Sequence, residues 1–159
     1  MAARVKTFTY HTSIEWKHGV EATLSSHDKP AIGISTPPEF KGPEGNWTPE
    51  NLLVAAVESC LLFTFLSLAK SCKLEFAAYA SHAEGLLEPV FDKLVISKVT
   101  VRPRIEVMTE QDAEKARRIM GQVEEQCFIS NSIESDVIIE PEIVVTAVIP
   151  ARSGGSVKS

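Results

Sequence analysis

A single long apolar segment limits what this chain can fold into. Residues 52–69, LLVAAVESCLLFTFLSLA, are apolar on nearly every face of a helix. A helix that is apolar all round has to be buried all round, and one sheet covers only one side of it. In a chain of 159 residues the other side is free to meet a second copy. The segment therefore predicts a homodimer, most simply one with twofold symmetry.

A membrane-spanning role is the alternative for this segment. Its length is at the lower limit for a span, but Glu58 lies in its middle, where a carboxylate is costly in lipid. We therefore expect a core helix and no membrane. The N-terminal residues MAARVKTFTYHTS contain no apolar signal-peptide core. Three cysteines are too few for a disulfide framework, which favours a reducing, cytoplasmic location.

Charge and composition exclude some classes of function. The net charge is −5 and the pI is about 5.4, whereas a nucleic-acid surface needs clustered Lys and Arg. A hydrophobic share of 44% and a charged share of 23% are ordinary for a soluble globular protein. We expect one domain over residues 1–150 and a flexible tail over 151–159, which is polar and contains Gly and Ser.

The order of predicted elements indicates an α+β fold. Thr48 and Pro49 are suited to start a helix, and Thr109 to start a second one, whose apolar stripe runs through Ala116, Met120, Val123 and Cys127. Alternating segments predict strands at 5–16, 21–26, 31–36, 73–87, 91–107 and 136–149. Because helices do not alternate singly with strands, we expect antiparallel sheet.

The residue types alone leave the role of the cysteines open. A buried free cysteine usually packs as a small hydrophobic residue, and this interpretation applies to Cys60, Cys127 and Cys72. The wide Cys spacing and the absence of paired His spacing predict no metal site. There is also no glycine-rich phosphate loop and no G-x-S-x-G motif.

Two segments resemble the motifs of one known superfamily. Residues 48–60, TPENLLVAAVESC, resemble the first-cysteine motif of the OsmC/Ohr superfamily of osmotically inducible and organic hydroperoxide resistance proteins. Residues 127–132, CFISNS, resemble its second motif, usually Cys-Pro-x-Ser-x followed by a small residue. The 67-residue separation of the cysteines and the Pro-rich loop ending at Trp47 also fit. The resemblance covers about residues 5–148.

The resemblance implies an intertwined homodimer in which antiparallel sheets pack around two long central helices. It implies a thiol-dependent peroxidase that reduces organic hydroperoxides at the dimer interface, with Cys60 as peroxidatic and Cys127 as resolving thiol. The reductant would be an external thiol or dithiol, with no cofactor. Glu50 matches the motif glutamate that positions an activating arginine. We further hypothesise that Phe40 and Trp47 line a pocket for an alkyl or lipid peroxide.

The sequence departs from this pattern at two points. No arginine lies between Arg4 and Arg102, so Lys17 is our candidate to activate Cys60, ahead of Arg102 and Arg104. Phe128 replaces the proline of the second motif.

Three roles stay open for Glu58: it faces the loop, it pairs with a basic group in the site, or it raises the pKa of Cys60 by its proximity. Two alternative functions also stay open. One is a non-enzymatic protein that binds a hydrophobic small molecule in the same pocket, and the other is a redox sensor.

Overall fold

The computed structural model describes residues 6–146, which fall into an N-terminal unit ending at Leu53 and a C-terminal unit beginning at Val54. The predicted tail, residues 151–159, lies outside the described residues, as does the end of the last predicted strand. Whether the chain is one domain stays a prediction.

The N-terminal unit is built on an antiparallel meander of three strands. Its strands are β1 (Ser13–His18), β2 (Glu21–Ser25) and β3 (Ile32–Ser35), in the sheet order β1-β2-β3. The predicted first strand was too long, because regular pairing begins only at Ser13. A short helical turn, η1 (Pro38–Phe40), follows, and Trp47 then pairs with β3 through a backbone bridge to Ile34.

The first long helix, α1 (Pro49–Ser71), begins where the sequence predicts. The Asn51 N–H donates to Thr48 Oγ1 at 3.2 Å, and the Thr48 N–H donates back to Asn51 Oδ1 at 3.3 Å. This reciprocal capping satisfies two amides that the first helical turn leaves without partners. Pro49 suits the first position because it has no N–H to satisfy.

The C-terminal unit contains a mixed sheet. It consists of β4 (Ala78–Val90), β5 (Lys93–Val107), β6 (Asp136–Ile139) and β7 (Glu142–Val145). β4 pairs with β5 antiparallel, whereas β6 and β7 both pair with β5 in parallel. The α+β class is confirmed, but the sheet is not antiparallel throughout. A second helix, α2 (Glu110–Gln126), connects β5 to β6, and such a crossover permits the parallel return.

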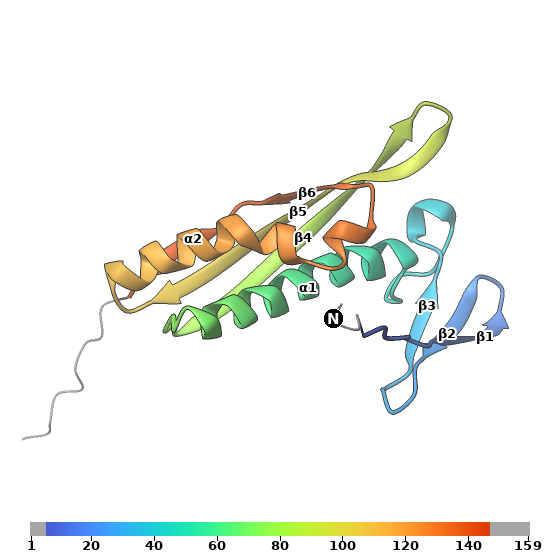
Figure 1. The fold of residues 1–159 in the computed structure, drawn as a ribbon. Helices are drawn as coiled ribbons and strands as arrows, with labels where there is room; N and C mark the ends of the chain where they lie inside the picture. The colour runs from blue at the N-terminus through green and yellow to red at the C-terminus, as the bar shows by residue number, and fades with distance from the viewer. Residues whose placement is uncertain (1–5, 147–159) are drawn as a thin grey trace, which may run out of the picture. The chain divides into compact units, whose positions relative to one another are not determined.

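The core of this unit lies between α1, α2 and one face of the sheet (Figure 1). α1 contributes one line of buried residues at a spacing of four: Val57, Leu61, Phe65 and Ala69. α2 contributes the predicted stripe, and Ala116, Met120, Val123 and Cys127 are all buried. Val99, Val101 and Ile105 face inward from β5 and have no exposed surface. Phe65 stacks edge-on against Phe76, with ring centroids 5.3 Å apart.

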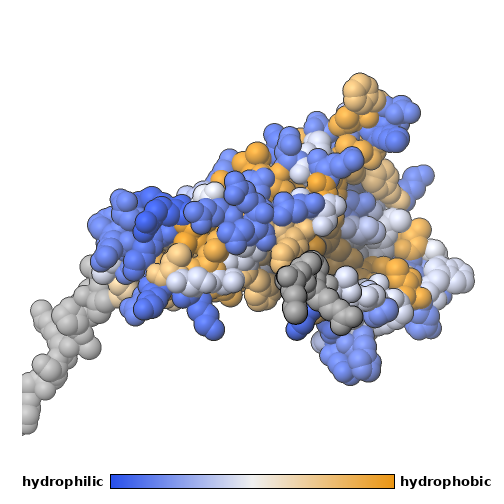
Figure 2. All heavy atoms as spheres, viewed as in Figure 1, coloured by the Kyte–Doolittle hydropathy of each residue, from blue (hydrophilic) through white to orange (hydrophobic). Residues whose placement is uncertain are grey.

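Of the residues of α1, only Val57, Leu61, Phe65 and Ala69 are buried by the part of the chain that the structure describes. By length and composition α1 is the one helix among residues 6–146 that could cross a membrane, a test that the core helices of soluble proteins also pass. Its exposed side includes Phe63, which is 66% exposed. Figure 2 shows apolar surface over this part of the molecule and at the tip of the β4–β5 hairpin.

Candidate functional site

The C-terminal unit brings the two predicted reactive cysteines together. Cys60 lies on α1 and is partly buried, while Cys127 caps the C-terminal end of α2 and is wholly buried. Both pack against the same apolar core. Their side chains interact, and each changes the pKa of the other. Cys72, the third cysteine, is exposed just after α1.

The surroundings of Cys60 favour its thiolate. Burial raises the pKa of Cys60, but the hydrogen-bond donors around it outweigh burial, so the pKa lies below its ordinary value. The strongest donor is the Cys127 thiol, followed by the backbone N–H groups of Ile129 and Phe128 and the Thr64 hydroxyl. Thr64 lies one helical turn after Cys60, on the same face of α1.

The surroundings of Cys127 have the opposite effect. Burial raises the pKa of Cys127, the neighbouring Cys60 raises it further, and the donors at Ser130 only partly oppose this. One of those donors is the Ser130 N–H, 3.4 Å from Cys127 Sγ. Cys60 is therefore the group that ionises first, and Cys127 remains a thiol that donates to it. This asymmetry matches the roles that one nucleophilic and one resolving thiol require.

A compact turn after α2 carries most of the donors around the two sulfurs. The Cys127 N–H donates to the carbonyl of Glu124, and the Asn131 N–H donates to the carbonyl of Cys127 at 3.0 Å. The Ser132 N–H closes the turn on the carbonyl of Ile129 at 2.9 Å. These internal bonds fix the backbone conformation of the 127–132 segment.

Among residues 6–146, Glu58 bonds a hydroxyl and no basic group. Ser81 on β4 donates to Glu58 Oε1 at 2.6 Å, which satisfies a carboxylate that would otherwise be costly inside the apolar helix. Burial raises the pKa of the nearby Tyr79, the Ser81 hydrogen bond lowers it, and the charge of Glu58 raises it. The groups that shift the pKa of Cys60 do not include Glu58.

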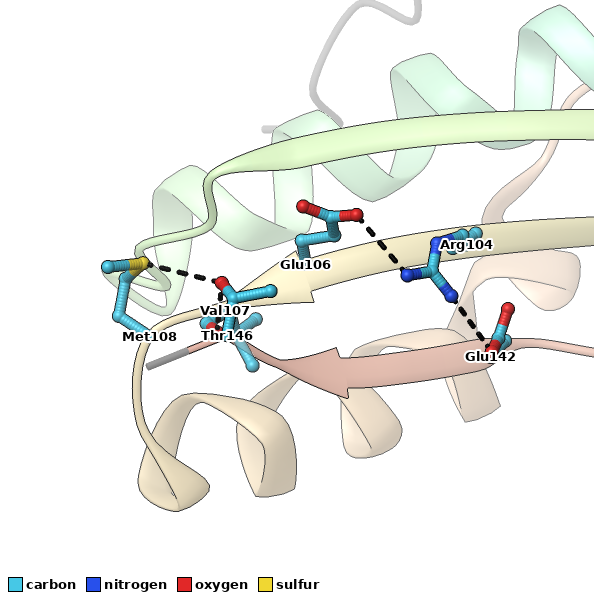
Figure 3. A network of polar contacts seen from close by, with 6 residues as sticks. All are labelled: Arg104, Glu106, Val107, Met108, Glu142 and Thr146. Atoms are coloured by element: carbon cyan, nitrogen blue, oxygen red, sulfur yellow. Dashed lines mark hydrogen bonds and ion pairs between the residues drawn. The ribbon is translucent and has the colours of Figure 1, made fainter. Parts of the chain in front are cut away.

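Arg102 and Arg104 bond carboxylates in the described part of the chain and are not among the groups that shift the pKa of Cys60. Arg102 bonds Glu140 at 2.8 Å and Glu84 at 2.9 Å. Arg104 lies between Glu142, at 2.9 Å, and Glu106, at 3.4 Å (Figure 3). Both arginines alternate along β5 with the buried residues of the core, so they occupy the opposite face of the sheet.

The other predicted site residues belong to the N-terminal unit. Lys17 lies on β1 and forms an exposed ion pair with Glu15 at 2.9 Å. Phe40 is 51% exposed in η1, and Trp47 is 48% exposed beside β3. Glu50 lies in the first turn of α1, and its Oε2 atom is buried without a hydrogen-bond partner among the described residues. Their roles in a site stay predictions.

Sequence reasoning missed three contributors around the sulfur of Cys60. These are the Thr64 hydroxyl and the main-chain N–H groups of Phe128 and Ile129. The spacing of four residues from Cys60 could have indicated that Thr64 lies on the same helix face. Phe128 stands where the motif has proline, and this difference could have indicated an additional N–H donor, because proline has no N–H. Among the described residues, no group of three His, Cys, Asp or Glu side chains could hold a metal ion.

One family model matches more than half of this chain. Residues 42–142 match the family model described as OsmC-like protein. The uncharacterized protein YmaD of Bacillus subtilis (strain 168) is 24% identical over 115 residues, which cover 70% of this chain and 77% of YmaD.

Solved structures show the same fold. An OsmC-like protein of unknown function from Vibrio cholerae has a TM-score of 0.75 and 26% identity, over 85% of this chain and 99% of that one. An organic hydroperoxide resistance protein from Elizabethkingia anophelis has a TM-score of 0.69 and 16% identity, and the match covers 89% of this chain and 99% of that one. The fold and the family model thus agree with the cysteine motifs, and the chain belongs to the OsmC-like protein family.

Proposed function

We propose that this protein is a thiol-dependent peroxidase that reduces organic hydroperoxides through Cys60 and Cys127. The observation that carries the proposal is that the fold packs Cys60, from α1, and Cys127, from the end of α2, against the same apolar core. The pKa of Cys60 is lowered and that of its partner Cys127 is raised. A thiolate is the nucleophile in such reactions, and a neighbouring protonated thiol is suited to resolve the product. That some family neighbours are named organic hydroperoxide resistance proteins supports the substrate class.

The reaction balances with two protein thiols and one external dithiol. The Cys60 thiolate attacks the distal oxygen of ROOH, the O–O bond breaks, and the alkoxide leaves and takes a proton to become ROH. Cys60 is then a sulfenic acid. Cys127 attacks its sulfur, a disulfide forms, and water leaves. A dithiol reduces the disulfide by two exchange steps and becomes a disulfide itself.

The apolar surroundings of the cysteine pair favour an organic over an inorganic peroxide. Cys60 and Ile129 pack against the apolar core, together with Leu66 and Val54. An alkyl group gains free energy by leaving water for such a surface, whereas hydrogen peroxide has no alkyl group to bury. A cytoplasmic setting, where dithiol reductants are abundant, suits this chemistry.

We also propose that the active form is a homodimer. The buried residues of α1 all lie on one side of the helix. Phe63 lies exposed on another side, together with the partly buried Leu62 and Leu66. An apolar helix face of this kind is stable in water only when a partner covers it. A second copy of the same helix around a twofold axis is the simplest cover.

The test is turnover of cumene hydroperoxide by the pure protein with a dithiol reductant. The wild type should consume the peroxide, and Cys60→Ser should be inactive because it has no nucleophile. Cys127→Ser should stall or over-oxidise at Cys60, because no thiol captures the sulfenic acid. Cys72→Ser is the matched control and should keep wild-type turnover.

Two other outcomes would reject the peroxidase proposal. In the first outcome, the folded protein with free thiols shows no turnover, but peroxide still oxidises Cys60. Such a protein would be a redox sensor. In the second outcome, Cys60 of the folded protein does not react with peroxide, and the wild type and the Cys60→Ser variant bind a hydrophobic ligand equally well. Such a protein would be a binding protein.

A further inference from the structure

A groove of about 380 Å³ lies between α2 and the edge of the sheet that β6 and β7 form. Small-molecule sites in proteins typically have volumes of about 300–1,000 Å³. Neither Cys60 nor Cys127 lines this groove, so it is separate from the cysteine pair. Its lining residues all belong to the C-terminal unit, and they are Arg117, Met120, Gly121, Ile139, Pro141 and Ile143.

Two features of the sequence keep the groove open. Pro141 lies in the break between β6 and β7, where the missing N–H interrupts the edge of the sheet. Gly121 lies inside α2, although glycine destabilises a helix interior relative to alanine. Nothing lies within 4 Å of the position that its Cβ atom would take, so packing among the described residues does not require a glycine here. The space over Gly121 is therefore available to a bound molecule.

The walls of the groove are aliphatic. Met120 is buried beneath it, and Ile139 and Ile143 are half-buried beside it. An aliphatic chain gains free energy by leaving water for such side chains, and the flexible thioether of methionine adapts to chains of different shape. No aromatic ring is among the lining residues that the structure describes, so the groove offers no stacking surface for a planar ligand.

Arg117 brings a positive charge to this apolar groove. It lies four residues before Gly121, on the same face of α2. Its ion pair with Glu114 is long, at 3.6 Å, and both side chains are more than half exposed. Such exposed pairs contribute little to stability, so the guanidinium can exchange Glu114 for a carboxylate of a ligand. Arginine binds a carboxylate through two parallel hydrogen bonds.

We propose that this groove binds an aliphatic carboxylate of medium chain length. The chain lies over Gly121 between the aliphatic walls, and the carboxylate pairs with Arg117. A protein partner fits the groove less well, because stable interfaces take about 20–30 residues from each side, whereas six of the described residues line this one. The site does not depend on the proposed peroxidase activity.

The first experiment adds decanoate to the full-length reduced protein and follows the assigned methyl signals by NMR. The methyl signals of Met120, Ile139 and Ile143 should shift together and reach saturation, because these side chains contact the bound chain. Signals that do not move would overturn the proposal. It would also fail if decanoate shifted only the methyl signals of Thr64 and Ile129, because the ligand would then occupy the surroundings of Cys60.

The second experiment tests the role of the charge. The wild type should bind decanoate about tenfold more tightly than decan-1-ol, since hydrogen bonds to a charged group add to the contact of the chain. Arg117→Gln should remove this preference. Arg118→Gln is the matched control, because Arg118 is exposed on α2 and does not line the groove. Equal affinities of the Arg117→Gln and Arg118→Gln variants for decanoate would overturn the proposal.

The third experiment fills the groove. Gly121→Leu should leave the fold intact, because leucine is a strong helix former and its Cβ atom meets no neighbour. Its side chain would occupy the space over Gly121, so saturable binding of decanoate should be lost. Circular dichroism and denaturant unfolding confirm that the variant is folded. A folded Gly121→Leu protein that binds decanoate as the wild type does would contradict the proposal.

Discussion

At the scale of single residues, the thiol of Cys127 serves as a donor before it serves as a nucleophile. It is the strongest of the groups that lower the pKa of Cys60, and the same interaction raises its own pKa. The two directions favour the charge on the partly buried sulfur of Cys60 and the proton on the buried sulfur of Cys127. This arrangement keeps the resolving thiol protonated until a sulfenic acid is present beside it.

Replacing Cys127 tests this exchange of a proton directly. Cys127→Ala should raise the pKa of Cys60, because removing a donor to the thiolate disfavours the charged form. Cys127→Ser should raise it less, since its hydroxyl still donates. The pH dependence of Cys60 alkylation in a Cys72→Ser background measures both values. A pKa of Cys60 that does not differ between Cys127→Ala and the parent would rule out the donor role.

The residues of the site divide into those that sequence predicts and those that it does not. The positions of Cys60 and Cys127 follow from motif spacing, and the burial of Cys127 follows from the apolar stripe of α2. The donors at Phe128 and Ile129 are main-chain N–H groups, which every residue except proline carries. The side chain that each N–H group faces depends on the conformation of the turn, and only the fold reveals that.

At the scale of elements, the packing of α1 against β4 depends on one glycine. A Cβ atom at Gly85 would lie 2.6 Å from Val54 Cγ2 on α1, closer than two carbon atoms approach. The side chain of Val54 is stiff because it branches at Cβ. The glycine therefore sets how closely the strand approaches the helix that carries Cys60.

Adding a methyl group at this contact should be costly. Gly85→Ala should destabilise the protein by about 1–3 kcal/mol through overpacking, and adding Val54→Ala should recover part of that loss. Gly121→Ala on α2 is the matched control, because nothing lies within 4 Å of its Cβ position. It should stabilise by up to about 1 kcal/mol from helix propensity. Denaturant unfolding measures all three. A Gly85→Ala protein as stable as the wild type would disprove the close approach.

The elements also show where sequence patterns reach their limit. Thr48 and Thr109 predict the two helix starts correctly, since capping is local chemistry. The last predicted strand is broken into β6 and β7 at Pro141, which has no N–H for the ladder. The sequence did not predict that these strands run parallel to β5, because pairing direction depends on the crossover and not on alternation.

At the scale of the whole molecule, the apolar side of α1 predicts the assembly. Phe63→Glu should convert the proposed dimer into a monomer, because it would place a charge in an apolar interface. Arg118→Glu changes charge on the exposed side of α2 and should leave the dimer intact. Sedimentation velocity at micromolar concentration distinguishes the species. A wild type that is strictly monomeric there would contradict the dimer.

The central claim is that Cys60 and Cys127 act as one oxidisable pair, and a single-turnover measurement tests it most directly. The reduced Cys72→Ser protein is mixed with one equivalent of cumene hydroperoxide at neutral pH and analysed by intact mass and peptide mapping. The account predicts rapid loss of two hydrogens per chain and a Cys60–Cys127 disulfide. Cys127→Ser should instead gain one oxygen at Cys60. A Cys72→Ser protein that stays reduced, or that is oxidised at both sulfurs without a disulfide between them, would contradict the account.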